Sequence, residues 1–525
     1  MCYNISKIFL MDNIKMHLKV IKKNESFCNL EFSDFAIKEM IFKEFSFRPE
    51  GYKFMPKFRM GKWDGFVRLY DRFRNLFPLG LVSKLYYFCV KKNIVIEFEN
   101  FDKSNTIFNE NYVLDYAENI LKLPFKIRDY QLDGVLKGLS ERHCILLSPT
   151  GTGKSLIIYI ILRLVLKYNK KFKILIVVPT LSLIDQMVGD FDDYAVNTTL
   201  NFNNLCQKIY SGACKQINKQ IVVSTYQSLE NIEPEYFEQF GALLVDECHT
   251  GSLKGNVNNK IASYCINAKY KIGFSGTLQD AQVNLYSLIS SFGQIFQLTK
   301  TINEIERGNL SKIIVRQIVL HYPENDCKDF YNGLDELESD EGSSAPVVFN
   351  YEIDWINNKP YKSNLILDIC EKYANNTLIL FKRTEFGTSL FSRIKFAFIN
   401  RKVFLVTGLT EKEEREKIRA ICEKHNNCVI VANYRIFSTG INIKNLHNVI
   451  FGESVKSKIT TLQSIGRSLR LNNNKEIANV FDIVDCIRFE DRENIIFRHS
   501  ASRGDIYEKE SFEVIRQNIE VGNPK

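Results

Sequence analysis

The clearest chemistry in the sequence lies in the run Ser148-Pro149-Thr150-Gly151-Thr152-Gly153-Lys154-Ser155. Glycines in such a run let backbone N–H groups turn toward phosphate oxygens, and a helix that starts there adds a favourable dipole. Lys154 would neutralise the β- and γ-phosphates of a nucleotide and Ser155 would bind Mg²⁺. The run therefore predicts an ATP·Mg²⁺ site at Thr150, Gly151, Thr152, Gly153, Lys154 and Ser155. Ser148 stands where the general pattern has glycine, and a chance glycine-rich turn is the alternative.

A second candidate is the run Asp246-Glu247-Cys248-His249, which directly follows the apolar stretch 242–245. Carboxylates at the C-terminal end of a parallel strand can meet a phosphate loop at the same edge of the sheet. Asp246 would hold Mg²⁺ through water, and Glu247 would polarise the attacking water as general base. For His249 the alternative to a functional role is a core histidine whose hydrogen bonds are satisfied.

Short β-branched runs that alternate with helix-length segments surround these residues. The expected strands are Cys144–Leu147, Ile174–Val178, Ile221–Val223, Ala242–Val245 and Ile272–Phe274, then Thr377–Phe381, Val403–Val406, Cys428–Val431, Val449–Phe451 and Val480–Val484. Continuous apolar strands between helices indicate parallel sheets covered on both faces. The rhythm occurs twice, so two α/β domains of similar size are expected.

The ordered motifs in both domains resemble those of superfamily 2 helicases. Before residue 310 they are Arg128-Asp129-Tyr130-Gln131, the phosphate loop, Pro179-Thr180, Ser224-Thr225-Tyr226-Gln227, Asp246–His249 and Ser275-Gly276-Thr277. After it they are Phe381-Lys382-Arg383, Ser438-Thr439-Gly440-Ile441-Asn442 and Gln463-Ser464-Ile465-Gly466-Arg467-Ser468-Leu469-Arg470. The resemblance implies two tandem RecA-like domains that bind and hydrolyse ATP.

The resemblance also implies roles for single residues. Arg128 and Gln131 would read the adenine, Gly440, Asn442 and Gln463 would contact the nucleotide, and His249, Ser275 and Thr277 would couple hydrolysis to movement. Sugar-phosphate contacts would come from Thr180, Thr225, Arg383, Thr407 and Thr439. Asn442 stands where many relatives have Asp. Arg467 and Arg470 are three residues apart and share a helix face, so both could stabilise transition-state charge, although a surface salt-bridge helix is the alternative.

The N-terminal region narrows the resemblance to UvsW-type helicases of T-even bacteriophages. Residues 45–54, 58–65 and 75–82 carry it, together with Phe292–Phe296 and Val455–Ile459. Residues 41–80 contain nine Lys or Arg, four acids and eleven aromatic residues. Basic and aromatic residues together can track a phosphate backbone and stack on unpaired bases. Arg59, Lys62 and Trp63 are the candidates for DNA contact, although most of the rings are expected to form the core of this small domain.

Composition excludes several classes of protein. With 45% hydrophobic and 25% charged residues the chain is typical of globular proteins. It has 13 scattered cysteines and no C-x-x-C pair, which argues against a disulfide framework or zinc site and favours a reducing compartment. No apolar run is long enough to span a membrane. We therefore expect an intracellular, cytoplasmic protein.

The expected organisation has five parts. They are a small α+β nucleic-acid-binding domain (1–100), an ATP-binding RecA-like domain (101–310), a linker with an acidic insertion (311–365), a second RecA-like domain (366–485) and a charged tail (486–525). Residues 324–354 carry ten acids and one base, so the net charge of +9 hides +18 on the rest of the chain. We expect this insertion to be a solvated loop kept away from the nucleic acid, or a weak mimic that competes with it.

The resulting expectation is an ATP- and Mg²⁺-dependent DNA helicase or translocase. The resemblance implies work on forks, Holliday junctions, D-loops and R-loops in recombination, repair and replication, in a virus-encoded protein acting as a monomer in its host. Single-stranded and branched DNA, RNA–DNA hybrids and replication proteins would be its partners. An RNA helicase or transcript-release factor of the DEAD/DEAH type, a passive binding module and a P-loop kinase are the alternatives.

Overall fold

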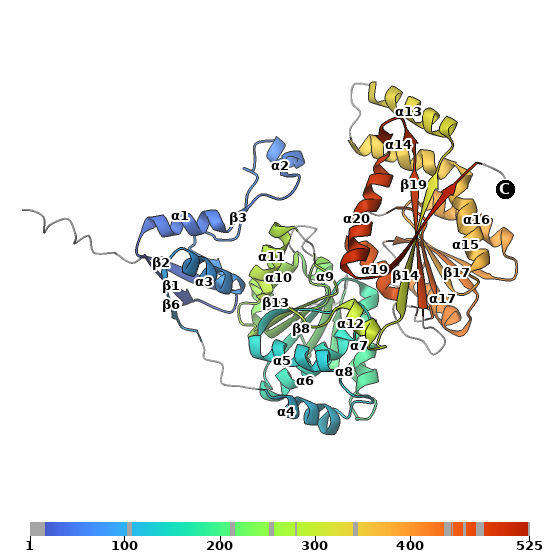
Figure 1. Ribbon diagram of the computed structural model, residues 1–525. Coiled ribbons are helices and arrows are strands. Elements are labelled where there is room, and N and C mark those ends of the chain that lie inside the picture. Colours follow the sequence, from blue (N-terminus) through green and yellow to red (C-terminus); the bar gives the residue numbers. More distant parts are fainter. Residues whose placement is uncertain are drawn as a thin grey trace, which may run out of the picture. The chain divides into compact units, whose positions relative to one another are not determined.

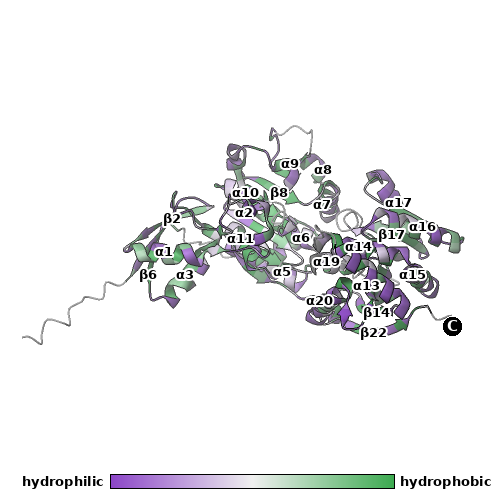
Figure 2. Cartoon of the chain, turned by 90° about the horizontal axis from the view of Figure 1, so that it is seen from above, coloured by the Kyte–Doolittle hydropathy of each residue, from purple (hydrophilic) through white to green (hydrophobic). Residues whose placement is uncertain are grey.

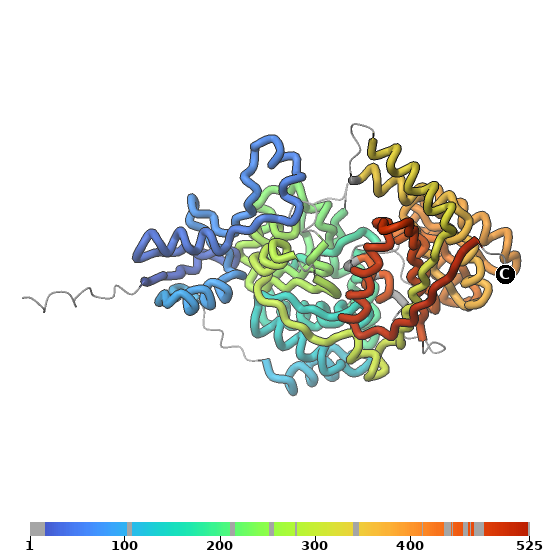
Figure 3. Tube along the Cα trace, turned by 45° about the horizontal axis from the view of Figure 1, so that its top comes forward, coloured from blue at the N-terminus to red at the C-terminus, as the bar shows by residue number. Residues whose placement is uncertain are grey.

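The computed structural model describes residues 16–101, 108–210, 216–250, 257–278, 281–339, 345–434, 443, 445–454, 458–468 and 477–522. The chain divides into two compact units (Figures 1 and 3). One unit consists of Met1–Ser148 and Lys154–Leu298, and the other of Pro149–Gly153 and Thr299–Lys525. Within the described residues no helix has the length and apolar character needed to cross a membrane. The eleven cysteines among them are all buried, and none of them forms a disulfide.

A small mixed sheet opens the first unit. Its strand order is β5 (Phe77–Pro78), β2 (Phe27–Phe32), β1 (His17–Lys22) and β6 (Val95–Glu99), with β1 antiparallel to β2 and parallel to β6. Burial alternates along β1 and β2, so one face packs against α1 (Phe35–Glu44) and α3 (Val82–Lys91). The prediction of a small α+β domain is confirmed.

A protruding segment, which we call the basic arm, runs from Ser46 to Arg68. Its ends form the antiparallel pair β3 (Ser46–Phe47) and β4 (Val67–Arg68). Between them lie the 3₁₀ helix η1 (Tyr52–Phe54) and the single turn α2 (Pro56–Arg59), and Figure 1 shows α2 standing away from the small sheet.

The small sheet is fixed to the following domain by a buried polar contact. The Lys271 Nζ donates to Ser26 Oγ at 2.5 Å and to the Ala262 carbonyl at 2.9 Å, and the Lys271 side chain is almost fully buried. Backbone N–H of Glu25 donates to the Ile266 carbonyl at 2.9 Å. Ile289 is one of the buried residues of the small domain's own core. The two parts of the first unit therefore share both core and hydrogen bonds.

The first large sheet has seven parallel strands. Their order is β13 (Gln294–Gln297), β7 (His143–Leu147), β12 (Tyr270–Ser275), β11 (Phe240–Val245), β8 (Lys173–Val178), β10 (Ile221–Thr225) and β9 (Cys206–Ile209). One face packs against α5 (Asp129–Glu141), α6 (Lys154–Tyr168) and α7 (Leu181–Tyr194), and the other against α9 (Tyr226–Leu229), α10 (Val257–Tyr264) and α11 (Gln282–Phe292). Figure 2 shows the hydrophobic colour along strands such as β8.

The second large sheet lies in the second unit and is also fully parallel. Its order is β16 (Lys402–Val406), β17 (Cys428–Asn433), β15 (Thr377–Phe381), β18 (Asn448–Phe451), β19 (Ile477–Cys486), β14 (Lys312–His321) and β22 (Glu513–Glu520). Its main helices are α15 (Pro360–Lys372), α16 (Thr384–Ala397), α17 (Lys412–Lys424), α19 (Lys458–Ser468) and α20 (Ile495–Lys509). All ten predicted strands are present, and the prediction of two tandem parallel-sheet domains is confirmed.

The acidic insertion is not a solvated loop, so that prediction is wrong. It forms α13 (Glu324–Ser339) and α14 (Ala345–Asn358), which pack on the second sheet. Cys327, Phe330, Tyr331 and Leu334 are buried at helical spacing, while most of the acids of α13 lie on the exposed face. The high charge masked an ordinary amphipathic pattern.

The expected linker and charged tail both contribute strands to the second sheet. Strand β14, from the expected linker, pairs with β19 and with β22, and β22 comes from the expected tail. Two short strands, β20 (Arg488–Phe489) and β21 (Arg492–Glu493), form a hairpin that precedes α20. Residues 486–522 are therefore an integral part of the second domain rather than a tail.

Candidate functional site

The phosphate loop lies between the end of β7 and the start of α6. Gly151 and Gly153 have φ angles of +89° and +81°, a backbone conformation that residues with a Cβ rarely adopt. The Thr152 hydroxyl donates to the Pro149 carbonyl at 2.7 Å and closes the turn. Ser148 N–H donates to the Ser275 carbonyl at 2.9 Å, which ties the loop to β12. The predicted strand–loop–helix context is present.

Lys154 contacts the predicted general base. Its Nζ lies 3.2 Å from Glu247 Oε1, and its side chain is only 11% exposed. The same ammonium donates to the Ser148 carbonyl at 3.4 Å. Ser155, the next residue, has its Oγ 2.7 Å from the Tyr194 hydroxyl. The loop's cation and the carboxylate at the end of β11 therefore meet at one sheet edge, as the sequence predicted.

The pKa values of the two adjacent carboxylates are shifted in opposite directions. Burial, with the charge of Glu247 beside it, raises the pKa of Asp246 to about 7. Burial also acts on Glu247, but the Lys154 ammonium and His249 hold the pKa of Glu247 below its usual value. Glu247 is thus the member of the pair that loses its proton more readily. Asp246 is a buried carboxylate whose ionised form lacks enough positive charge nearby, and a divalent cation held with the Ser155 hydroxyl would supply that charge.

The three predicted coupling residues come together behind Glu247. His249 Nδ1 lies 2.7 Å from Ser275 Oγ and 3.5 Å from Glu247 Oε2, and the ring is buried. Ser275 Oγ donates to the carbonyl of Thr277. Burial lowers the pKa of His249, so its ring is neutral at physiological pH. A continuous chain of contacts therefore runs from Lys154 through Glu247 to the end of β12.

The predicted adenine-reading residues cap the first turn of α5. Arg128 N–H donates to Gln131 Oε1 at 3.0 Å, and the Arg128 guanidinium donates to the Tyr130 hydroxyl at 3.0 Å. Helix α5 packs directly against α6, where Gly138 leaves room for Ile161. The element thus lies on the helix next to the one that starts at Lys154.

Two predicted nucleic-acid contacts lie at neighbouring strand ends. Thr225 is the last residue of β10, and Thr180 lies two residues after the end of β8. The two strands pair in register up to Val178 and Thr225. Thr225 Oγ1 accepts from Ser228 N–H at 3.3 Å and is buried, and Thr180 Oγ1 lies 3.1 Å from Ser182 Oγ. Both hydroxyls are engaged at the starts of helices.

In the second domain Arg383 and Thr407 follow β15 and β16. The Arg383 guanidinium forms an ion pair with Asp354 of α14 and donates to Asn350 Oδ1 at 3.1 Å. Thr407 N–H donates to Thr410 Oγ1 at 3.0 Å. Gln463 and Arg467 lie within α19. Thr439, Gly440, Asn442 and Arg470 lie outside the described residues.

The rings of residues 41–80 mostly lie outside the core, so that part of the interpretation is wrong. Only Phe45, Tyr70 and Phe77 are buried among them. Trp63 is half-buried, and its indole N–H donates to the Phe66 carbonyl at 2.8 Å.

Arg59 and Lys62 are exposed, and the Arg59 guanidinium lies 5.9 Å from the ring centre of Phe54. Sequence reasoning missed Phe54, which is 74% exposed and is a better stacking candidate than Trp63. Arg48, Arg68 and Arg72 also stack on rings of this region.

Three family models match the chain. "DNA helicase UvsW, N-terminal" matches residues 14–99, "Type III restriction enzyme, res subunit" matches residues 124–280, and "Helicase conserved C-terminal domain" matches residues 361–472. These matches correspond to the small sheet and the two large sheets.

Individual relatives span most of the chain. The ATP-dependent DNA helicase uvsW of Enterobacteria phage T4 is 33% identical over 502 residues, covering 90% of this chain and 94% of the relative. The DNA 3'-5' translocase XPB2 of Sulfurisphaera tokodaii is 25% identical over 389 residues, covering 69% and 82%. The solved structure of Mss116p bound to ssRNA and AMP-PNP superposes with a TM-score of 0.54 at 15% identity, covering 81% of each chain. That last likeness concerns the fold alone.

Proposed function

Because the chain belongs to the UvsW family of ATP-dependent superfamily 2 helicases, we propose that it remodels branched DNA, driven by ATP hydrolysis. The observation that carries the ATP-hydrolysis part of this proposal is the contact chain from Lys154 through Glu247 and His249 to Ser275. It links the phosphate loop to the end of β12, where Ser275 and Thr277 are proposed to couple hydrolysis to movement. Forks, Holliday junctions, D-loops and R-loops are the proposed substrates, in recombination, repair and replication.

ATP would displace the resting contact between Lys154 and Glu247. The γ-phosphate takes the Lys154 ammonium, and Glu247 is then available to accept a proton from the attacking water. Mg²⁺, held by Asp246 and Ser155, would neutralise charge on the phosphate oxygens. Because His249 Nδ1 contacts both Glu247 and Ser275, a displacement of the Glu247 carboxylate reaches the end of β12 through one side chain.

Residues of the second domain would complete the reaction. Arg467 and Arg470 would stabilise transition-state charge when the two domains close on ATP. Gly440, Asn442 and Gln463 would contact the nucleotide, and Arg128 and Gln131 would contact the adenine. Hydrolysis would then depend on domain closure, and this dependence would couple ATP hydrolysis to movement along the nucleic acid.

The nucleic-acid track would use contacts that do not read sequence. Thr180, Thr225, Arg383, Thr407 and Thr439 are proposed to contact sugar-phosphate groups. For Thr225 this contact comes through the backbone, since its hydroxyl is buried. The basic arm, with Arg59, Lys62 and Trp63 and the exposed ring of Phe54, would hold unpaired bases near the branch point. We propose a monomeric, virus-encoded protein that acts inside the host cell, with RNA–DNA hybrids among its substrates.

The test measures ATP hydrolysis with single-stranded DNA and with single-stranded RNA, and unwinding of a fork, a Holliday junction, an R-loop and duplex RNA. We expect hydrolysis to be stimulated more by single-stranded DNA than by RNA, with unwinding of the three branched DNA substrates. Lys154→Ala should abolish both, whereas Lys171→Ala, an exposed lysine in front of β8, should leave both intact. Activity that survives Lys154→Ala, or that is confined to duplex RNA, would refute the proposal.

A further inference from the structure

Glu453 and Ser454, which follow β18, make a set of buried contacts that the proposed mechanism does not use. Glu453 is 5% exposed, and its Oε2 accepts from the backbone N–H groups of Lys382 and Arg383, each at hydrogen-bond distance. Its other oxygen accepts from Asn357 Nδ2 at 2.9 Å. Glu453 therefore fixes the turn from which Arg383 projects.

The next residue receives a buried arginine from the C-terminal helix. Arg503 Nη1 donates to Ser454 Oγ at 2.6 Å. Arg503 is fully buried, and it is paired with fully buried Asp482 of β19, with Nε at 2.9 Å and Nη2 at 2.9 Å from Oδ1. Asp482 Oδ2 also accepts from the Tyr507 hydroxyl at 3.0 Å and from Gln317 Nε2 at 3.2 Å. The pair thus links strands β19 and β14 to α20 and to the start of the α19 connection.

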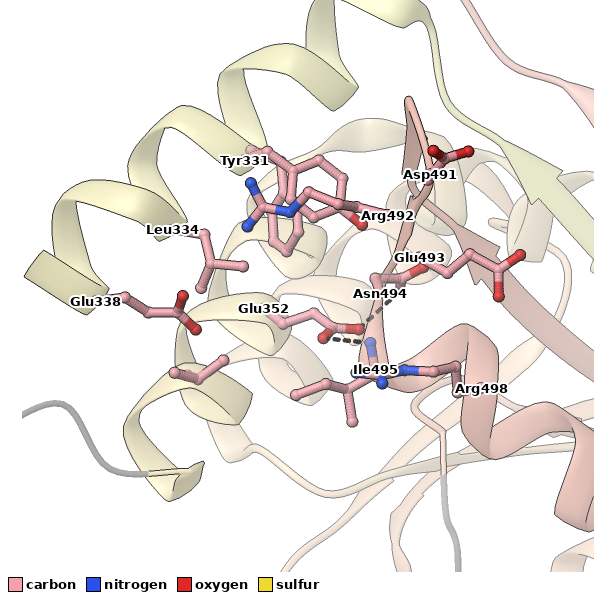
Figure 4. Close-up of a pocket in the computed structure, with 12 residues that line it drawn as sticks. Tyr331, Leu334, Glu338, Glu352, Asp491, Arg492, Glu493, Asn494, Ile495 and Arg498 are labelled. Atoms are coloured by element: carbon pink, nitrogen blue, oxygen red, sulfur yellow. Dashed lines mark hydrogen bonds between the residues drawn. The ribbon is translucent and has the colours of Figure 1, made fainter.

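Apolar contacts reinforce the same arrangement. Leu462 and Ile465 of α19 belong to one core cluster with Ile506 and Tyr507 of α20. The first turn of α20 is fixed by Glu352 of α14, which accepts from Ile495 N–H at 2.9 Å and Ile496 N–H at 2.7 Å. Figure 4 shows the Glu352 carboxylate directed at this helix start, in a cavity of about 720 Å³. Helix α20 is therefore held at its beginning and at its middle.

A buried ion pair contributes little net stability to a fold, because desolvation offsets its attraction. Removing a guanidinium and a carboxylate from water costs several kcal/mol each, and well-packed apolar residues often serve stability equally well. The pair does, however, fix the orientation of its partners, because the planar guanidinium binds a carboxylate and a hydroxyl in fixed geometry. At this place the hydroxyl belongs to Ser454, four residues before α19.

We propose that Arg503 is a positioning residue for α19. It holds Ser454, and its helix α20 packs against Leu462 and Ile465 of α19. Glu453, beside Ser454, holds the turn of Arg383. These contacts would together place the helix that carries Arg467 and the arginine proposed to contact phosphate. This inference rests on the proposed function, because it assigns Arg467 of α19 to the nucleotide. In this proposal Arg503 does not bind ATP. It keeps Arg467 placed for the DNA-stimulated hydrolysis of ATP.

The decisive variant is Ser454→Ala, which removes the acceptor and leaves the Arg503–Asp482 pair intact. We expect kcat of DNA-stimulated ATP hydrolysis to fall roughly tenfold or more, since small misplacements of a catalytic group are costly. KM for ATP, and Kd for single-stranded DNA, should stay within about twofold of wild type. Ser454→Thr keeps the hydroxyl and should restore most of kcat. Ser392→Ala, an exposed serine of α16, is the matched control.

A second variant tests the Arg503–Asp482 ion pair itself. The double substitution Arg503→Met with Asp482→Leu removes both charges together, and it should lower kcat as Ser454→Ala does. Unchanged kcat in folded Ser454→Ala and in the folded double variant would overturn the inference. If wild type hydrolyses ATP and Lys154→Ala does not, such a result leaves the proposed function standing. If wild type itself shows no DNA-stimulated hydrolysis, the proposed function fails first.

Discussion

Replacing Asp354 by Asn should strengthen DNA binding. The Asp354 carboxylate is paired with the Arg383 guanidinium, which we propose as a contact for backbone phosphate. DNA must displace this carboxylate before a phosphate can take its place. Asp354→Asn keeps the size of the side chain and removes the competing charge, while the hydrogen bond from Arg383 to Asn350 Oδ1 remains available.

The size of the effect follows from the exposure of the pair. The Arg383 and Asp354 side chains are 30% and 55% exposed, so water and salt screen the interaction. Exposed ion pairs contribute about 0.2–1 kcal/mol, which corresponds to a gain in affinity of roughly 1.4- to 5-fold. The gain should shrink as salt rises, because exposed charges are screened over about 10 Å at 0.1 M.

Fluorescence anisotropy with a labelled single-stranded oligonucleotide, over a series of salt concentrations, measures this directly. Glu336→Gln is the matched control, because it removes the same charge from the exposed face of α13. An equal gain in both variants would show that only net charge matters. Unchanged or weaker binding in Asp354→Asn would refute the idea that this carboxylate competes with phosphate.

Three further predictions concern the first unit. Glu247→Gln should retain ATP binding but lose about 100-fold or more of kcat, measured by a fluorescent ATP analogue and by phosphate release; rapid hydrolysis would exclude Glu247 as the base. Phe54→Ala should weaken single-stranded DNA binding by about 1–3 kcal/mol, while hydrolysis without DNA stays unchanged; wild-type affinity would remove this ring from the track. Burial lowers the pKa of Lys271 from 10.5 to about 8, so the unfolded chain binds more protons than the folded one between these values, and stability should rise with pH across that window. Lys271→Met should flatten this rise, by up to about 3 kcal/mol, in thermal unfolding followed from pH 7.5 to 10.5; identical slopes would contradict it.

The parallel strands and the phosphate loop could be predicted because their signals are local. A run such as Ile174–Val178 is buried on both faces and reads as apolar throughout, and the loop's glycines leave few alternatives. Lys154 and Glu247 could be paired in advance because both follow strands of one parallel sheet, whose C-terminal ends meet at one edge.

The acidic insertion could not be predicted in this way, because its charge and its packing point in different directions. Phe330 and Leu334 follow helical spacing within a segment whose acids dominate any reading by composition. The Arg383–Asp354 pair depends on α14, the second helix of the insertion, and therefore could not be predicted either. In the basic arm the choice between Trp63 and Phe54 depended on which ring the turn buries, and that is decided by the hydrogen bond from Trp63 to Phe66.

The shared core of the first unit sets an order of events during synthesis. The small sheet leaves the ribosome first, yet its core contains Ile289, and Lys271 must reach Ser26. Ile289 is translated about 190 residues after the small sheet ends, which at roughly 5–20 residues per second takes about 10–40 s. During that interval the nascent small domain exposes the apolar surface that Ile289 later covers. A fragment that ends near residue 100 remains permanently in this incomplete state.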